Sequence, residues 1–129
     1  MKNGDKFLIH FEVNKSVYEG FAKIFKDKNP LHIDKSFAQE HGFSSVVMHG
    51  NILGGFLSFF IGECLPFKDI MIISQNINYK NPVYLNDKLA LKSEIIHYFE
   101  STGLFEFKYH FENQSGFKVA NGKILIKRL

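Results

Sequence analysis

Apolar and polar residues alternate at the start of the chain in the way that a strand buried on one face requires. Every second residue of the segment 7–13 is apolar, with more polar residues between. The apolar spacing then becomes that of a helix over residues 17–25, with Ser16 as its N-cap and Pro30 beyond its end. The sequence therefore predicts a strand followed by a helix.

The segment from Gly50 to Leu65 is apolar on nearly every side of a predicted helix. In a globular protein this pattern is typical of a helix enclosed by other structure, so we expect it to be the core helix. Gly54 and Gly55 inside it each cost roughly 1 kcal/mol relative to alanine. We expect tight packing against a neighbouring backbone to require them, or alternatively a ligand.

The second half of the chain alternates again and predicts successive strands. They cover residues 71–79, 89–99, 105–111 and 117–126, separated by turn residues, with Gly122 as a possible β-bulge. Strands joined by such short turns pair antiparallel, and a curved sheet wrapped around one apolar helix buries that helix economically. We therefore predict an α+β fold of the hot-dog type, as a single domain over residues 1–129.

Composition narrows the possible partners and location. Sixteen Lys and Arg against 13 Asp and Glu give a formal charge of +3, and the basic residues are scattered apart from Lys127 and Arg128. We therefore expect no nucleic-acid partner, although a mild positive field would favour an anionic carrier such as coenzyme A.

The single Cys64, expected to be a buried small apolar residue, excludes an internal disulfide. The segment 52–62 is too short to span a bilayer and no secretory signal begins the chain, so we expect a cytoplasmic protein without a membrane partner.

An unusually long connection, residues 27–49, separates the two predicted helices. We expect a short helix within it from about Lys35 to His41, capped by Ser36 and closed by Gly42. Asp27 and His32 flank a proline turn, so both side chains can face one small volume. A carboxylate and an imidazole are a natural acid and base pair for adding water to an α,β-unsaturated thioester, without a metal.

The start of the core helix supplies a second chemical element. Backbone N–H groups are unpaired at a helix N-terminus and its dipole is positive, so a developing negative charge is stabilised there. Gly50 also lets an oxygen atom approach closely. Its amide is our candidate donor to the thioester oxygen.

Taken in order, these motifs resemble the MaoC-like dehydratases and (R)-specific enoyl-CoA hydratases. The resemblance implies a catalytic dyad of Asp27 and His32, support of that dyad by Asn29, a carbonyl-polarising amide at Gly50, and a homodimer or larger homo-oligomer. This sequence departs from the family pattern at Phe25-Lys26, where the family usually carries a small residue and a glycine. The matching motifs are Asp27-x-Asn29-Pro30-Leu31-His32-x-Asp34, Phe37-Ala38, Gly42-Phe43, His49-Gly50, Leu65-Pro66, the strand from Gln75 to Pro82, and Asn86-Asp87.

The predicted function is a lyase that reversibly hydrates a trans-2-enoyl thioester, with no cofactor beyond the coenzyme A or acyl carrier that bears the substrate. The residues expected around that substrate are Asn29, His49, Asn51 and Phe56. Asp34 and His49 are also expected to be hydrogen-bonding partners within the loop.

Several alternatives remain open at the level of the sequence. Asp27 and Asn29 could be ordinary turn residues around a proline. A metal cluster of His32, Asp34, His41 and His49 is disfavoured, because their spacing matches no compact ligand pattern. The alternative functions are a hot-dog thioesterase and a non-catalytic acyl-CoA or acyl-carrier binding module.

Overall fold

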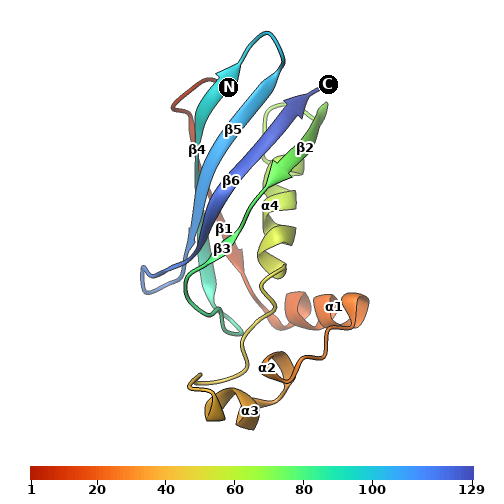
Figure 1. Ribbon diagram of the computed structural model, residues 1–129, viewed down its shortest axis with the longest axis vertical. Coiled ribbons are helices and arrows are strands. Elements are labelled where there is room, and N and C mark those ends of the chain that lie inside the picture. Colours follow the sequence, from red (N-terminus) through yellow and green to blue (C-terminus); the bar gives the residue numbers. More distant parts are fainter.

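A computed structural model describes all residues, 1–129. One curved sheet packs against the long helix α4, and three shorter helices lie together beyond one end of the sheet (Figure 1). Both chain termini lie at the opposite end. In chain order the elements are β1 (Lys6–Glu12), α1 (Lys15–Phe25), α2 (Pro30–Ile33), α3 (Lys35–Glu40), α4 (Ile52–Glu63), β2 (Ile70–Gln75), β3 (Asn78–Tyr79), β4 (Lys88–Phe99), β5 (Leu104–Glu112) and β6 (Lys118–Arg128).

The sheet has six strands in the order β1-β4-β5-β6-β2, with β3 also paired to β6, and every pairing is antiparallel. This confirms the predicted α+β hot-dog architecture. The predicted strand 71–79 is two strands, β2 and β3. The predicted bulge at Gly122 is wrong, because Gly122 pairs in register with Tyr109. A Cβ atom at Gly122 would lie 2.1 Å from the carbonyl oxygen of Asn76, so close backbone approach explains this glycine.

The core lies between the inner face of the sheet and one face of α4. That helix face contributes Ile52, Leu53, Leu57, Phe60 and Ile61, all buried. The phenylalanine-rich composition is concentrated here: the ring centroid of Phe60 lies 5.5 Å from that of Phe7 and 5.7 Å from that of Phe107. Edge-to-face packing of this kind stabilises a core beyond the effect of burial alone.

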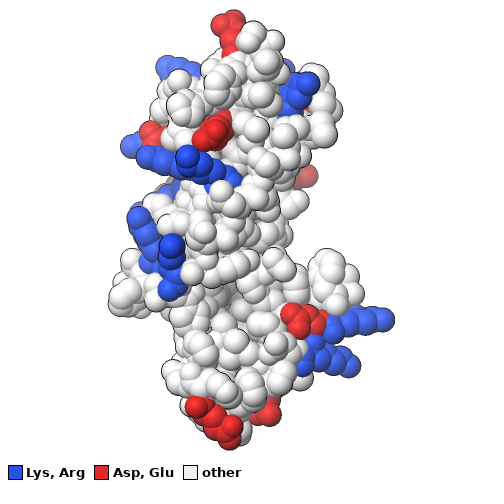
Figure 2. Space-filling view, in the orientation of Figure 1, with Lys and Arg blue, Asp and Glu red and all other residues white.

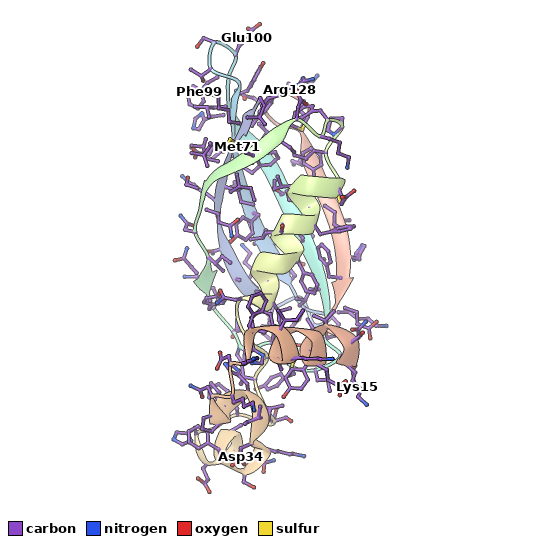
Figure 3. All side chains as sticks on the ribbon, turned by 90° about the vertical axis from the view of Figure 1, so that its right-hand side faces the viewer. Lys15, Asp34, Met71, Phe99, Glu100 and Arg128 are labelled. Carbon is purple, nitrogen blue, oxygen red and sulfur yellow. The ribbon has the colours of Figure 1, made fainter.

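The opposite face of α4 is not enclosed, contrary to the prediction from its composition. Gly55, Ser58 and Gly62 are exposed, and the side chain of Phe59 is 51% exposed. Figure 3 looks onto this side of the helix, which lies in front of the sheet. A Cβ atom at Gly54 or Gly55 would have no neighbour within 4 Å, so tight packing within the chain does not explain either glycine.

The three short helices depend on polar caps more than on burial. The side chain of Asn14, rather than the predicted Ser16, caps α1, and Asp34, rather than Ser36, caps α3. In both helices the capping residue lies two positions before the predicted cap, and its backbone is extended. Gly42 follows α3 with φ +89°, as a glycine beyond a helix C-terminus often does. The helix α2 was not predicted, because four residues give no periodicity.

The outer face of the sheet is polar. Lys92, Lys108 and Lys123 there pair with Glu112, Glu94 and Glu106, respectively, at 3.1 to 3.6 Å. Basic side chains on the side shown in Figure 2 are separated by wide uncharged areas and form no continuous basic face. Cys64 is partly exposed, not buried as predicted, and it has no disulfide partner. No helix is long and apolar enough to cross a membrane.

Candidate active site

Asp27 stands where the chain leaves α1 and turns toward α2. The turn is made by Lys26, whose backbone is left-handed, with φ 59° and ψ 24°, while its N–H donates to the carbonyl of Ala22. Glycine adopts this conformation without steric cost, whereas a residue with a side chain is strained there. Lys26 is the position at which the family that the sequence resembles usually carries glycine, and the left-handed backbone explains why glycine is suited to it.

The Asp27 carboxylate is fixed by the turn that follows it. Its Oδ1 accepts the backbone N–H of Asn29 at 3.1 Å, and the side chain of Asn29 in turn accepts the N–H of Leu31 at 3.0 Å and caps α2. Oδ2 is left facing His32, 3.7 Å from its Nε2 atom. The motif therefore turns one carboxylate oxygen to the backbone N–H of Asn29 and the other to the imidazole of His32.

His32 is held from the opposite side by the segment before α4. Its Nδ1 atom lies 2.7 Å from the carbonyl oxygen of Val47, which can only accept, so Nδ1 carries the ring proton. The lone pair of the neutral ring is then on Nε2 and faces Asp27. The hydroxyl of Tyr18, on α1, donates to the backbone carbonyl of His32. A backbone carbonyl and a tyrosine from two other elements thus set the orientation of this ring.

His49 is buried beside the pair, at 3% exposure. Its ring stacks on that of His32 with centroids 4.0 Å apart, and its Nε2 atom lies 2.9 Å from the backbone carbonyl oxygen of Asp27. Nε2 therefore donates to this carbonyl, and the buried Nδ1 has no partner. His49 connects the backbone at Asp27 to the start of α4.

The fold brings Asp27, His32 and His49 close enough to resemble a metal site, with one ligand atom of each within 4.8 Å of the others. The predicted alternative cluster is not assembled in this form, since Asp34 caps α3 and His41 contacts the carbonyl of Phe37. In the group that is assembled, Nε2 of His49 donates to the carbonyl of Asp27, so the lone pair of that ring is on the buried Nδ1 atom, which has no partner. The carboxylate of Asp27 and Nε2 of His32, 3.7 Å apart, can accept and return a proton without a metal.

Gly50 presents an unpaired amide to the same region. Neither its N–H nor that of Asn51 donates a hydrogen bond within the chain, and α4 begins directly after them. A Cβ atom at Gly50 would lie 2.8 Å from the ring of Tyr79, so a larger residue there would require this ring to move. Burial raises the pKa of Tyr79, whose hydroxyl is therefore neutral at physiological pH.

A cavity of about 540 Å³ joins these groups. Its lining includes Asp27, His32, His49, Gly50 and Asn51, so most of the predicted site residues meet there. Phe56 lines an adjoining apolar groove instead, and Asn29 lines neither space. A hollow of about 980 Å³ on the outer face of the sheet is larger, but it contains none of the predicted site residues, and three of its five lysines form ion pairs.

Sequence reasoning missed the parts of the site that come from elsewhere in the fold. The carbonyl of Val47, the hydroxyl of Tyr18 and the ring of Tyr79 all contact predicted site residues. A backbone carbonyl leaves no mark in the sequence. The two tyrosines have the spacing of ordinary helix and strand residues, so no local signal identifies them.

Comparison with known proteins identifies the family of this chain. The family model of the MaoC like domain matches residues 3–102, which is most of the chain. This chain belongs to the MaoC-like domain family. An (R)-specific enoyl-CoA hydratase of Aeromonas caviae is 28% identical over 107 residues, which make up 83% of this chain and 80% of that protein.

Two further similarities support membership of the MaoC-like family. A 3-hydroxybutyryl-CoA dehydratase of Methylorubrum extorquens is 34% identical over 84 residues, which make up 65% of this chain but 54% of that protein. The solved structure of the (R)-hydratase from A. caviae superimposes with a TM-score of 0.90 at 25% identity, covering 100% of this chain and 98% of that one. The hot-dog fold thus extends over the whole MaoC-like chain.

Proposed function

We propose that this MaoC-like protein is a hydratase that adds water reversibly to a trans-2-enoyl thioester, giving the (R)-3-hydroxyacyl thioester. The observation that carries the proposal is the placement of Asp27 Oδ2 3.7 Å from Nε2 of His32, beside an unpaired amide. The relatives named as an (R)-specific enoyl-CoA hydratase and a 3-hydroxybutyryl-CoA dehydratase support coenzyme A as the carrier.

Asp27 and His32 act on one water molecule. The carboxylate oxygen and the imidazole nitrogen both accept hydrogen bonds, and a water molecule within reach of both donates one hydrogen bond to each. As its oxygen bonds to the β carbon, the pair takes a proton from that water and returns one to the α carbon. The dyad is unchanged after each cycle, and dehydration follows the reverse path.

Gly50 stabilises the charge that forms on the thioester oxygen. Addition at the β carbon moves electrons toward the carbonyl, so the intermediate resembles an enolate. The unpaired N–H of Gly50, at the N-terminal end of α4, donates to this oxygen, and the ring of Tyr79 lies beside this glycine.

A second copy of the chain is the expected partner. β2 is an edge strand whose Met71, Ile72 and Ile73 are exposed, and α4 exposes Phe59 near it in sequence. An apolar edge strand of this kind favours pairing with another chain. We therefore expect a homodimer, which sedimentation would detect; a protein that remains monomeric at assay concentration would contradict this.

Turnover of crotonyl-CoA tests the proposed function. The purified protein is expected to remove the enoyl absorbance and to yield (R)-3-hydroxybutyryl-CoA, identified by chiral chromatography, without releasing free thiol. Thiol release detected by a trapping reagent would indicate the thioesterase alternative. Saturable binding of the thioester with neither reaction would indicate a non-catalytic binding module.

A further inference from the structure

Tyr79 reaches the catalytic cavity from β3, a strand at the end of the sheet nearest the short helices (Figure 1). It lines this cavity together with Asp27, His32 and Gly50. The atoms nearest to a Cβ position at Gly50 are all at the phenol end of its ring: Cε1 and Cζ at 2.8 Å and the hydroxyl oxygen at 3.1 Å. The hydroxyl itself therefore lies beside the glycine whose amide is the proposed donor to the thioester oxygen.

The hydroxyl of Tyr79 is free to donate a hydrogen bond. The hydroxyls of Tyr18 and Tyr109 each donate to a backbone carbonyl, whereas that of Tyr79 has no partner within the chain. Because burial raises the pKa of Tyr79, its hydroxyl keeps the proton at neutral pH. The cavity thus contains a neutral O–H donor besides the unpaired N–H groups of Gly50 and Asn51.

Hydrogen bonds on both sides of β3 hold the backbone that places this ring. Before the strand, the side chain of Asn76 accepts the N–H of Lys123 at 3.0 Å, and its carbonyl accepts the hydroxyl of Tyr109 at 2.6 Å. After the strand, the N–H of Lys80 donates to a carbonyl of β6 at 2.8 Å. β3 itself pairs with β6. Tyr79 therefore projects from a fixed element of the sheet, as the positioning of a reacting group requires.

We propose that the hydroxyl of Tyr79 is a catalytic group, a second hydrogen-bond donor to the thioester oxygen beside the amide of Gly50. This inference rests on the proposed hydratase function. A Cβ position is about 2.5 Å from the nitrogen of its own residue, so the hydroxyl lies within about 5.6 Å of the Gly50 nitrogen. One oxygen atom can accept from both groups at ordinary hydrogen-bond lengths. Negative charge grows on that oxygen as water adds to the β carbon, so the hydrogen bond is strongest in the transition state.

Removal of the hydroxyl alone tests the proposal. Tyr79→Phe keeps the ring against Gly50 and is expected to lower kcat for crotonyl-CoA about a hundredfold, with KM and Tm nearly unchanged. The matched control is Tyr98→Phe, which removes the hydroxyl of a partly exposed tyrosine on β4, outside the cavity, and should leave kcat unchanged. A wild-type kcat in Tyr79→Phe, or an increase in KM alone, would overturn the assignment.

The vibration of a bound carbonyl separates this proposal from the proposed function. Butyryl-CoA labelled with carbon-13 at the thioester carbonyl cannot be hydrated, and each donor to its oxygen lowers the frequency of the C=O stretch. In difference infrared spectra, this band is expected at a higher frequency in Tyr79→Phe than in the wild-type protein, with no change in Tyr98→Phe. If the band moves in this way but the wild-type protein does not hydrate crotonyl-CoA, the hydratase function is wrong and the contact stands. If hydration occurs and the band is the same in Tyr79→Phe and the wild-type protein, Tyr79 does not donate to the thioester oxygen and the proposal fails.

Discussion

The sheet with α4 and the segment of short helices α1–α3 are held together by different forces. The inner face of α4 and the facing strands bury large apolar side chains completely, among them Phe60, Phe107 and Phe111. The segment α1–α3 buries only Ala38 within its helices. Its positions are fixed by caps, turns and hydrogen bonds to neighbouring loops, such as those of Asn29 and His32.

This difference assigns stability and chemistry to separate parts of the molecule. Asp27 and His32 both belong to the segment with little burial, where one side chain is 49% exposed and the other 15%. A substrate can reach them there without opening the core. Substitutions in the sheet and α4 should therefore change mainly the free energy of unfolding, because that region is held together by burial. Substitutions in the segment α1–α3 should change mainly the catalytic rate, because hydrogen bonds position the reacting groups there.

The largest effect on stability is expected from Phe107→Ala. Phe107 is fully buried and packs against the rings of Phe7 and Phe60, so its removal should lower the free energy of unfolding by about 3–5 kcal/mol. The matched control is Phe25→Ala, which removes a 67% exposed ring of α1 and should cost no more than about 1 kcal/mol. Urea denaturation measures both; similar losses would contradict the comparison.

A smaller effect, on rate more than stability, is expected at His49. His49→Phe keeps a ring against His32 but removes the hydrogen bond to the Asp27 carbonyl, so the carboxylate should shift and kcat should fall about tenfold with little change in KM. His49→Gln retains a donor without the ring and should recover part of that loss. If both variants behave like the wild-type protein in steady-state assays, His49 does not position Asp27.

The smallest effect is expected at Lys26, at the junction of the two regions. Lys26→Gly relieves the left-handed backbone and should raise the free energy of unfolding by up to about 1 kcal/mol. Lys23→Gly, one turn earlier inside α1, should instead lower it by about 1 kcal/mol. Thermal unfolding of the two variants gives opposite shifts in Tm on this account, and shifts of the same sign would refute it.

The two regions also differ in how far the sequence predicts them. Alternating apolar residues locate β1, β4, β5 and β6 closely, because burial on one face of a sheet leaves a period of two. The prediction for α4 was wrong in one respect. Its apolar composition predicts a helix covered on every side, yet Phe59 is 51% exposed. Composition does not reveal whether the covering surface belongs to the same chain.

The site was predictable where its residues are neighbours in sequence. Asp27, Asn29 and His32 act through a local turn, so their spacing alone brings them together. The contact of His49 with the Asp27 carbonyl, and that of Tyr79 with Gly50, depend on how distant segments are placed by the sheet. Spacing within a single motif contains no information about such contacts.

The central claim is tested most directly by measuring crotonyl-CoA hydration and thermal unfolding on the same preparations of Asp27→Asn and His32→Ala. Each variant should lose a factor of about 10²–10⁴ in kcat. Each should keep a Tm close to that of the wild-type protein, because neither side chain is buried in the core. Folded variants that hydrate crotonyl-CoA at the wild-type rate would contradict the assignment of proton transfer to this pair.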